Sequence, residues 1–320
     1  MPGILIVAET SAGAVAPISF ELLGAARQLS AQGAGSVSAV VAGGEAEAKA
    51  LIAHGAEAVY TADAALAGQP ADASLAAVEA ALQASGADIV LVGTTSFGRD
   101  LGPALAFRQK TGIAMDCTEL KIEGGRLRAT RGCYGGNARA EHTWKAPLQI
   151  ATVKPKSFDA PEPDAGRSGA ITASGAAGES KVKVLGVAKA ESTGIRLEDA
   201  QVVVSGGRGL GDESGFRALE ELASVLPQAA VGASRAACDL GWYPPAAQVG
   251  LTGKVVSPNL YIAIAISGAS QHMAGMAGSK NIVAINKDPD ANMVKAAKFA
   301  IVDDYKKVVP ALIEEIKKLG

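Results

Sequence analysis

The fold of this chain is set by a pattern that is clearest in residues 260–272, LYIAIAISGASQH. The apolar run Leu260–Ile266 predicts a strand, and the polar loop Ser267–His272 separates it from a helix of small residues. The same order of strand, polar loop and helix recurs through the second half of the chain. The strands predicted there are Ala200–Val204, Leu260–Ile266, Asn281–Ile285 and Ala300–Val302. Helices are predicted at Phe216–Leu226, in a segment ending near Phe299, and at the C-terminus. Such alternation is typical of a parallel sheet flanked by helices.

The first half of the chain shows the same alternation. Its predicted strands are Ile4–Val7, Val37–Val41, Ala58–Tyr60 and Ile89–Val92, each followed by a segment rich in Ala, Leu and Glu. Runs such as ILIV at residues 4–7 lack polar alternation, as strands covered by helices on both faces do. After Thr118, shorter pieces punctuated by glycine predict hairpins or edge strands added to the parallel sheet. These pieces are Leu120–Ile122, Leu127–Thr130 and Leu148–Val153.

The domain organisation follows from length and composition. A chain of 320 residues is typical of about two domains. Residues 155–180 are rich in Pro, Gly, Ser and Ala, which favours irregular chain, and a strand at Val182–Val187 is expected to return to the first domain. The boundary is expected within Ala188–Ala200. We therefore expect an α/β fold with two domains, residues 1–190 and 191–320, each a mostly parallel sheet flanked by helices, the second Rossmann-like.

Composition excludes several classes of function. A net charge of -2 and 48% hydrophobic residues argue against disorder and against a basic nucleic-acid-binding protein. Met1–Glu9 lacks the basic segment of a signal peptide, and no apolar run reaches the roughly 20 residues that cross a bilayer. The scattered cysteines Cys117, Cys133 and Cys238 predict reduced thiols. We expect a cytoplasmic protein without membrane insertion.

The loop at residues 206–211, GGRGLG, predicts a site for phosphate. Its glycines leave backbone N–H groups unobstructed at a helix N-terminus, where the helix dipole favours an anion. The loop departs from the dinucleotide and Walker fingerprints, because Arg208 and Asp212 stand at the wrong positions. A glycine-rich turn that only closes a strand onto a helix is the alternative reading.

Other polar loops should meet this one, because the carboxyl ends of parallel strands share one edge of a sheet. His272 is one of only three histidines, and Arg235, Lys254 and Asn286 add cationic and hydrogen-bonding groups. Asp304 is explained either as a helix N-cap or as a partner for sugar hydroxyls. No nucleophile elbow, zinc-protease motif or metal-ligand spacing occurs, which disfavours hydrolytic and metal chemistry. The loops together suit a ligand with a diphosphate and a polar ring.

These residues resemble the α-subunit family of electron-transfer flavoproteins. The similarity is longest over residues 260–275, LYIAIAISGASQHMAG, and 282–288, IVAINKD. Further segments in the same order are 206–209, 232–235 and 250–254, and 98–103, GRDLGP, resembles the family's N-terminal domain. The resemblance covers essentially the whole chain. It implies a heterodimer in which the C-terminal domain of α holds FAD and the β subunit carries AMP.

The resemblance also implies roles for individual residues. Arg208 and the loop Ser267–His272 would hold the diphosphate and the ring edge, and Asn286 and Asp304 the adenosine part. The residues expected to contact FAD are Arg208, Ser234, Arg235, Val249, Gly250, Leu251, Thr252, Ser267, Gly268, Ala269, Ser270, Gln271, His272, Asn286, Asp304 and Tyr305. Near the ring, His272 and Arg235 are candidates for a cation and Thr252 for a hydroxyl donor. Leu251 stands where the family commonly has Gln, so at most a backbone contact is expected there.

By this resemblance the protein is an electron carrier without a substrate of its own. It would pass electrons from flavoprotein dehydrogenases to a membrane-associated quinone oxidoreductase. Two alternatives remain at this stage, a non-redox module that binds an adenine nucleotide and an electron-bifurcating relative with a second flavin in β. The loop Gly93–Asp100 also follows a strand, and we expect the N-terminal domain to be a scaffold and β-subunit interface rather than a nucleotide site.

Overall fold

The computed structural model describes residues 3–11, 13–134, 138–175, 178, 180–186 and 194–319. The chain divides into two compact units, residues 1–188 and 189–320, which are taken separately below. The domain boundary expected from the sequence, between residues 190 and 191, lies outside the described residues. The exact boundary therefore stays a prediction.

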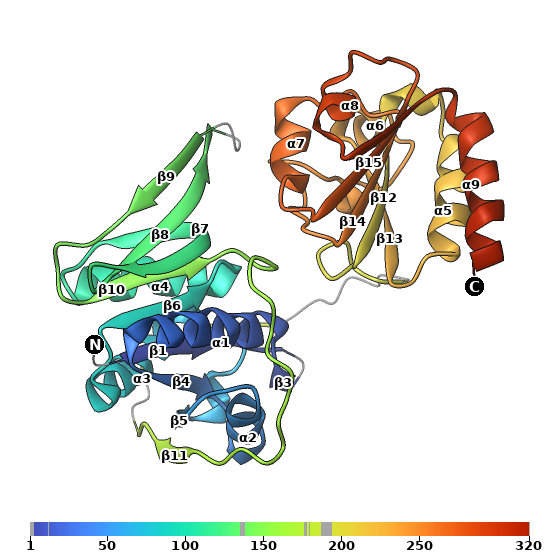
Figure 1. The fold of residues 1–320 in the computed structure, drawn as a ribbon. Coiled ribbons are helices and arrows are strands. Elements are labelled where there is room, and N and C mark those ends of the chain that lie inside the picture. The colour runs from blue at the N-terminus through green and yellow to red at the C-terminus, as the bar shows by residue number, and fades with distance from the viewer. Residues whose placement is uncertain are drawn as a thin grey trace. The chain divides into compact units, whose positions relative to one another are not determined.

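The N-terminal unit is built on one mixed sheet (Figure 1). Its nine strands lie in the order β11-β5-β4-β1-β6-β10-β7-β8-β9. All neighbours from β11 to β7 pair in parallel, and β8 and β9 are added antiparallel at the other end. The strands are β1 Gly3–Ala8, β4 Ser36–Ala42, β5 Ala58–Ala62, β6 Ile89–Gly93, β7 Ile113–Glu123, β8 Arg126–Cys133, β9 Ala138–His142, β10 Gln149–Val153 and β11 Ala170–Ala173. A separate two-stranded piece pairs β2 Thr10–Ser11 with β3 Ala14–Val15.

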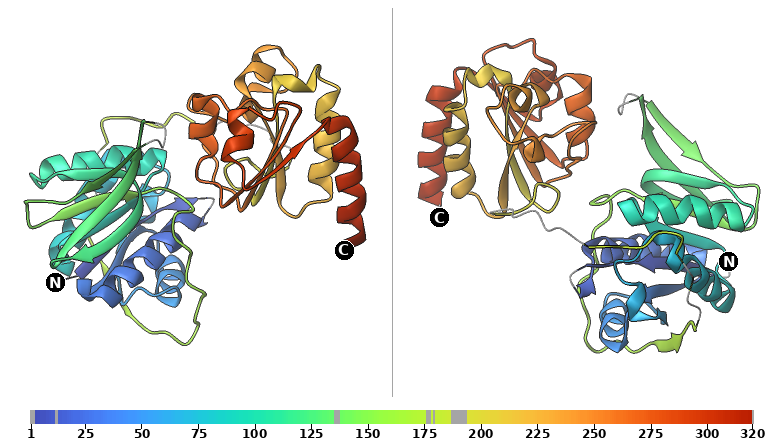
Figure 2. Two further views of the ribbon diagram at one scale, coloured as in Figure 1. Left: turned by 45° about the horizontal axis from the view of Figure 1, so that its top comes forward. Right: turned by 180° about the vertical axis from the view of Figure 1, so that it is seen from behind.

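Helices cover both faces of this sheet (Figure 2). In β1, Ile4 and Ile6 pack into one cluster with α1 Pro17–Leu29 and α2 Glu45–Ala53. Leu5 and Val7 point the other way, toward α3 Ala71–Ser85 and α4 Ser96–Arg108. Because successive side chains of a strand alternate between faces, a strand buried on both faces must be apolar throughout.

Three predictions for this unit need correction. Residues 149–153 form β10, a central parallel strand between β6 and β7, and not a hairpin or edge strand. An unpredicted strand, β11, pairs with β5 inside the segment expected to be irregular. Residues 182–186 form no strand, and Val187 lies outside the described residues. Strand β11 lies between Gly169 and Ser174 and has only four residues, which is too short a run to show a periodic pattern in the sequence.

The C-terminal unit has a five-stranded parallel sheet in the order β13-β12-β14-β15-β16. Its strands are β12 Val202–Gly206, β13 Ala229–Ala233, β14 Leu260–Ile264, β15 Asn281–Asn286 and β16 Phe299–Val302. Its helices are α5 Gly215–Ser224, α6 Arg235–Asp239, α7 Ser270–Met276, α8 Asn292–Ala296 and α9 Tyr305–Leu319. Helices α5 and α9 lie side by side on one face, and α7 and α8 lie on the other (Figures 1 and 2).

The helix expected to end near Phe299 is shorter than predicted. It ends at Ala296, because Ala297 is extended and the N–H of Lys298 bonds the carbonyl of Ile282. Phe299 instead opens the edge strand β16.

The strand order of the C-terminal unit reverses between β12 and β14. The chain leaves β12 for β13 on one side and later returns to β14 on the other. In a parallel sheet this reversal opens a crevice at the carboxyl ends of the strands, where ligands bind. The polar loops at residues 206–211, 267–272 and 286–288 follow strands of this edge, whereas the loop that contains Lys254 does not directly follow a strand.

Candidate functional site

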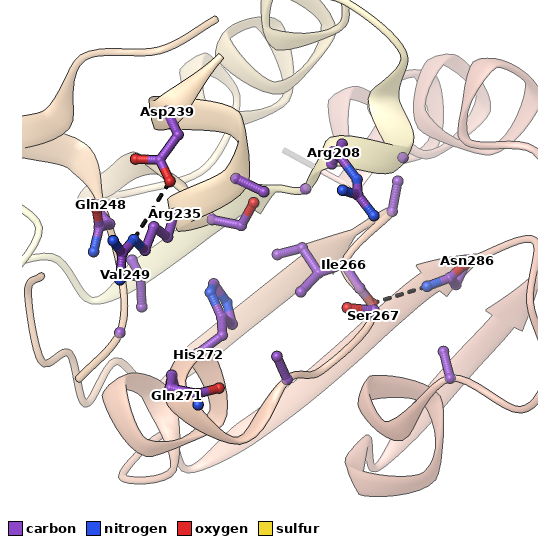
Figure 3. A pocket seen from close by; sticks show the side chains of 18 of the residues that line it. Arg208, Arg235, Asp239, Gln248, Val249, Ile266, Ser267, Gln271, His272 and Asn286 are labelled. Carbon is purple, nitrogen blue, oxygen red and sulfur yellow. Dashed lines mark hydrogen bonds and ion pairs between the residues drawn. The ribbon is translucent and has the colours of Figure 1, made fainter. Parts of the chain in front are cut away.

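A cavity of about 650 Å³ lies at this edge of the C-terminal sheet (Figure 3). It is lined by the loops after β12, β13, β14 and β15, and by the loop that contains Val249. Most of the residues predicted to contact a cofactor line it together. They are Arg208, Ser234, Arg235, Val249, Gly250, Leu251, Thr252, Ser267, Ala269, Gln271, His272 and Asn286. The volume falls within the usual range of about 300–1,000 Å³ for ligand sites.

The loop after β12 approaches the loop after β14 too closely for any side chain. A Cβ on Gly207 would stand 2.2 Å from the carbonyl oxygen of Ala265. Ala265 itself has φ of 55°, in the left-handed region that alanine rarely adopts. Its carbonyl accepts a hydrogen bond of 3.3 Å from the N–H of Gly209. The two loops therefore form one tightly fitted wall of the cavity.

Arg208 is the unpaired cation of the cavity. It is exposed, follows Gly207 directly and forms no ion pair within the part of the chain that the structure describes. In Figure 3 it approaches the cavity from one end, across from the end where Arg235 lies. Arg235 differs, because Nε lies 3.4 Å from a carboxylate oxygen of Asp239 one helical turn later. An anionic group at the Arg208 end would find a guanidinium free to bind it.

The loop at residues 249–252 is held against the start of α7. The N–H of Leu251 donates to the carbonyl of Gln271 at 2.8 Å, and the side chain of Leu251 is exposed. The Thr252 hydroxyl accepts a hydrogen bond of 3.0 Å from the Gln248 amide. Its own proton therefore remains available to a ligand, and the hydroxyl-donor role expected of Thr252 stays a prediction. Ser234 is partly engaged, because its hydroxyl caps α6 by accepting from the N–H of Ala237.

His272 is buried in the wall of the cavity, and Figure 3 shows its ring pointing from α7 into the space between Val249 and Ile266. Its Nε2 lies 2.9 Å from the hydroxyl of Tyr261, and its Nδ1 has no hydrogen-bond partner among the residues that the structure describes. Burial lowers the pKa of His272 to about 4. The ring is therefore neutral at pH 7, which departs from the expectation that it supplies a cation.

Asn286 holds two loops of the cavity together. Its side-chain amide donates to the carbonyl of Ile266 at 2.9 Å, and its side-chain oxygen accepts from the N–H of Asp288 at 3.1 Å. These contacts give Asn286 a structural role in shaping the cavity wall.

Some predicted residues lie outside the cavity and make other contacts. They are Gly268, Ser270, Asp304 and Tyr305. A Cβ on Gly268 would stand 2.3 Å from the backbone nitrogen of Met293, so this residue serves the contact with α8. The hydroxyl of the buried Tyr305 donates to the carbonyl of Leu210 at 2.9 Å.

Asp304 acts as the N-cap of α9. It accepts from the N–H of Lys306 at 3.0 Å and forms an ion pair of 3.0 Å with Lys287, and these contacts lower its pKa. Lys254 also lies outside the cavity, since it is paired with Glu198. The Ser270 hydroxyl contacts the side chain of its neighbour Gln271.

Sequence reasoning did not single out several lining residues. Asp239 could have been found, because it follows Arg235 by four residues, the spacing of an ion pair on a helix. Ala265 is also among them. The remaining ones are Ala236, Gln248, Ile266, Asp288 and Ala291, whereas Gly207 and Gly209, which also line the cavity, belong to the loop that the sequence predicts to bind phosphate.

A second cavity of about 400 Å³ lies in the N-terminal unit, at the carboxyl ends of β1 and β4. The charged residues of its lining are Glu9 and Asp100. Burial raises the pKa of Glu9, against the opposing effect of a hydrogen bond from Thr95. Carboxylates without a cation beside them repel phosphate, so this lining does not favour a nucleotide.

Other kinds of site were sought over the described residues. They contain no group of three or more His, Cys, Asp or Glu side chains that could hold a metal ion. None of the helices described here combines the length and apolar composition needed to cross a membrane.

Comparison with known proteins assigns both units. An electron transfer flavoprotein domain matches residues 4–178, and an electron transfer flavoprotein FAD-binding domain matches residues 196–277. The chain is 41% identical to the electron transfer flavoprotein subunit alpha of Bacillus subtilis, over 99% of this chain and 98% of the relative. It is 42% identical to the subunit of the same name from Megasphaera elsdenii, over 99% and 96%. It is 38% identical to protein FixB of Clostridium saccharobutylicum, over 99% and 97%. The chain therefore belongs to the electron transfer flavoprotein α-subunit family.

Proposed function

We propose that FAD binds in the cavity at the carboxyl edge of the C-terminal sheet. Arg208 and the loop at residues 267–272 hold its diphosphate side and ring edge, and Thr252 and Arg235 lie near the ring. The other contacts proposed are from Ser234, Val249, Gly250, the backbone of Leu251, and Asn286. Bound FAD supplies the capacity to take up and release electrons, and the chain's residues bind, orient and shield it.

The observation that carries this proposal is that one cavity contains two polar groups without hydrogen-bond partners in the described residues. Arg208 is a guanidinium without a described partner, beside a glycine loop that leaves backbone N–H groups accessible. At the other side, the buried Nδ1 of His272 finds no hydrogen-bond partner in the described residues. A buried polar atom without a partner costs about 1–3 kcal/mol unless a ligand satisfies it. A ligand with an anionic middle and a polar ring would satisfy both groups, and FAD has both parts.

We further propose that the chain works as an electron carrier in a heterodimer with an electron-transfer flavoprotein β subunit that carries AMP. Electrons would enter from flavoprotein dehydrogenases, such as the acyl-CoA dehydrogenases of fatty acid oxidation. They would leave to electron-transfer flavoprotein-quinone oxidoreductase. The names of the α-subunit relatives support the heterodimer, and the reduced-thiol pattern of the cysteines supports a cytoplasmic location.

The decisive experiment is co-expression of this chain with its β subunit, followed by a visible absorption spectrum and flavin quantitation. We expect one FAD per heterodimer that dithionite reduces and air reoxidises. Two flavins per heterodimer would replace the proposal with the electron-bifurcating alternative. A colourless, folded complex that retains an adenine nucleotide would overturn it in favour of the non-redox module.

A further inference from the structure

Tyr261 is the one contact of His272 that the proposed function leaves without a role. It lies on the central strand β14, and its side chain is fully buried. Its hydroxyl lies 2.9 Å from Nε2 of His272, in a contact with no solvent around it. A buried hydrogen bond of this kind fixes which ring nitrogen carries the proton, and so decides whether the other nitrogen donates or accepts.

Two arrangements are possible, with the ring proton of His272 on Nε2 or on Nδ1. The buried hydroxyl protons around Tyr261 distinguish them. The Ser205 hydroxyl is also buried on the neighbouring strand β12, and it lies beside the phenol without forming a hydrogen bond of normal geometry. If Nε2 of His272 donated to Tyr261, either the phenol proton or the Ser205 proton would have no acceptor. A buried unsatisfied donor of this kind costs about 1–3 kcal/mol.

The opposite arrangement gives both hydroxyl protons an acceptor and leaves only the ring proton to be satisfied by a ligand. Ser205 points its proton toward the phenol oxygen, Tyr261 donates to Nε2, and the ring proton is then on Nδ1. Nδ1 is the nitrogen that has no hydrogen-bond partner within the described part of the chain, and His272 lines the cavity.

We propose that Tyr261 is a positioning residue that holds His272 as the Nδ1–H tautomer, so that the buried ring offers the cofactor a neutral hydrogen-bond donor. This inference rests on the proposed placement of FAD in the cavity. A neutral donor strengthens its bond when negative charge grows on a ring acceptor, and so favours the reduced cofactor. Tyr261 does not touch the cavity and acts only through His272.

The first test reads the tautomer directly in the unmodified heterodimer. Long-range ¹H–¹⁵N correlation spectra distinguish a protonated from an unprotonated ring nitrogen. The chain has three histidines, and a His272→Gln variant assigns the signal of interest. We expect a proton on Nδ1 and none on Nε2, with and without FAD. A proton on Nε2, or on both nitrogens, would overturn the proposal.

The second test is the potential of bound FAD in a Tyr261→Phe heterodimer. We expect FAD content to be retained and the preference for reduced over oxidised FAD to fall about tenfold. For a two-electron couple this corresponds to about 30 mV toward lower potential. The control is Tyr243→Phe, which removes a phenol hydroxyl 3.3 Å from Glu220 in the same unit, away from the cavity. Equal potentials in the two variants would overturn the proposal.

The two measurements separate this inference from the proposed function. If the heterodimer contains no flavin, the proposed function fails, and the tautomer of His272 can still be read. If FAD is bound but the proton is on Nε2, the proposed function stands and the role of Tyr261 falls. Should Tyr261→Phe fail to fold, the spectrum of the unmodified heterodimer decides alone.

Discussion

Replacing His272 with glutamine is expected to remove a pH dependence from the stability of the C-terminal unit. The buried ring has a pKa of about 4, and an unfolded histidine has a pKa of 6.5. Because the folded pKa is the lower one, the unfolded chain binds more protons between these two values. Stability is therefore complete above about pH 6.5 and is lost as the pH falls toward 4.

The size of the effect follows from the same two values. A shift of one pKa unit is about 1.36 kcal/mol, so the full loss below pH 4 is about 3 kcal/mol. At pH 5 the unfolded histidine is almost fully protonated and the folded one almost neutral, which gives a loss of about 2 kcal/mol relative to pH 7.5. This loss is a large fraction of the free energy of unfolding of a typical domain.

The assay is urea unfolding of the flavin-free chain at several values of pH from 4.5 to 8. Trp144 and Trp242 are the chain's two tryptophans, and a Trp144→Phe background leaves Trp242 to report on the C-terminal unit. Carboxylates titrate in the same range, so the quantity to follow is the difference between this background and the same chain with His272→Gln. Glutamine keeps a polar partner for Tyr261. Two stability curves that run parallel from pH 7.5 to 5 would refute the reasoning.

Two further predictions concern the cavity. Gly207→Ala should destabilise the C-terminal unit by about 1–3 kcal/mol and reduce FAD content, because the added Cβ meets the Ala265 carbonyl. The control is Gly186→Ala, which has open space around its Cβ and should change neither stability nor FAD content in the same urea and flavin assays. Arg208→Gln should weaken FAD binding about 10- to 100-fold in a fluorescence titration, because a charge-assisted hydrogen bond is lost. The control is the exposed Arg217→Gln, and equal affinities for FAD in the two variants would rule the Arg208 contact out.

The alternation of strand and helix was predictable because it depends on local sequence. Runs such as 4–7 and 89–92 can be buried only between two layers of helices, and they lie in the parallel core. The position of β10 was not predictable in the same way. Its strand was recognised, but its neighbours β6 and β7 are set by contacts distant in sequence. Local patterns carry no information about such pairing.

The candidate site shows the same division. Sequence placed the loops at one edge, because strand ends in a parallel sheet meet there. The sequence does not show which side of a loop faces the cavity. Gly268 and Tyr305 were therefore predicted to contact the cofactor, whereas Gly268 faces α8 and Tyr305 faces the core. Nor does the sequence show the protonation of His272, since the pKa depends on burial by residues from several elements.

The order of strands in the N-terminal sheet constrains how the chain is assembled during synthesis. Strand β10 lies between β6 and β7, yet it leaves the ribosome after both, and after the hairpin of β8 and β9. Until residues 149–153 emerge, the edges of β6 and β7 have no partner, and pairing them directly would exclude β10. The sheet can therefore close between β6 and β7 only after residues 149–153 have emerged, and a pause in translation before Gln149 would prolong the time in which two unpaired strand edges stay available to chaperones or to other nascent chains.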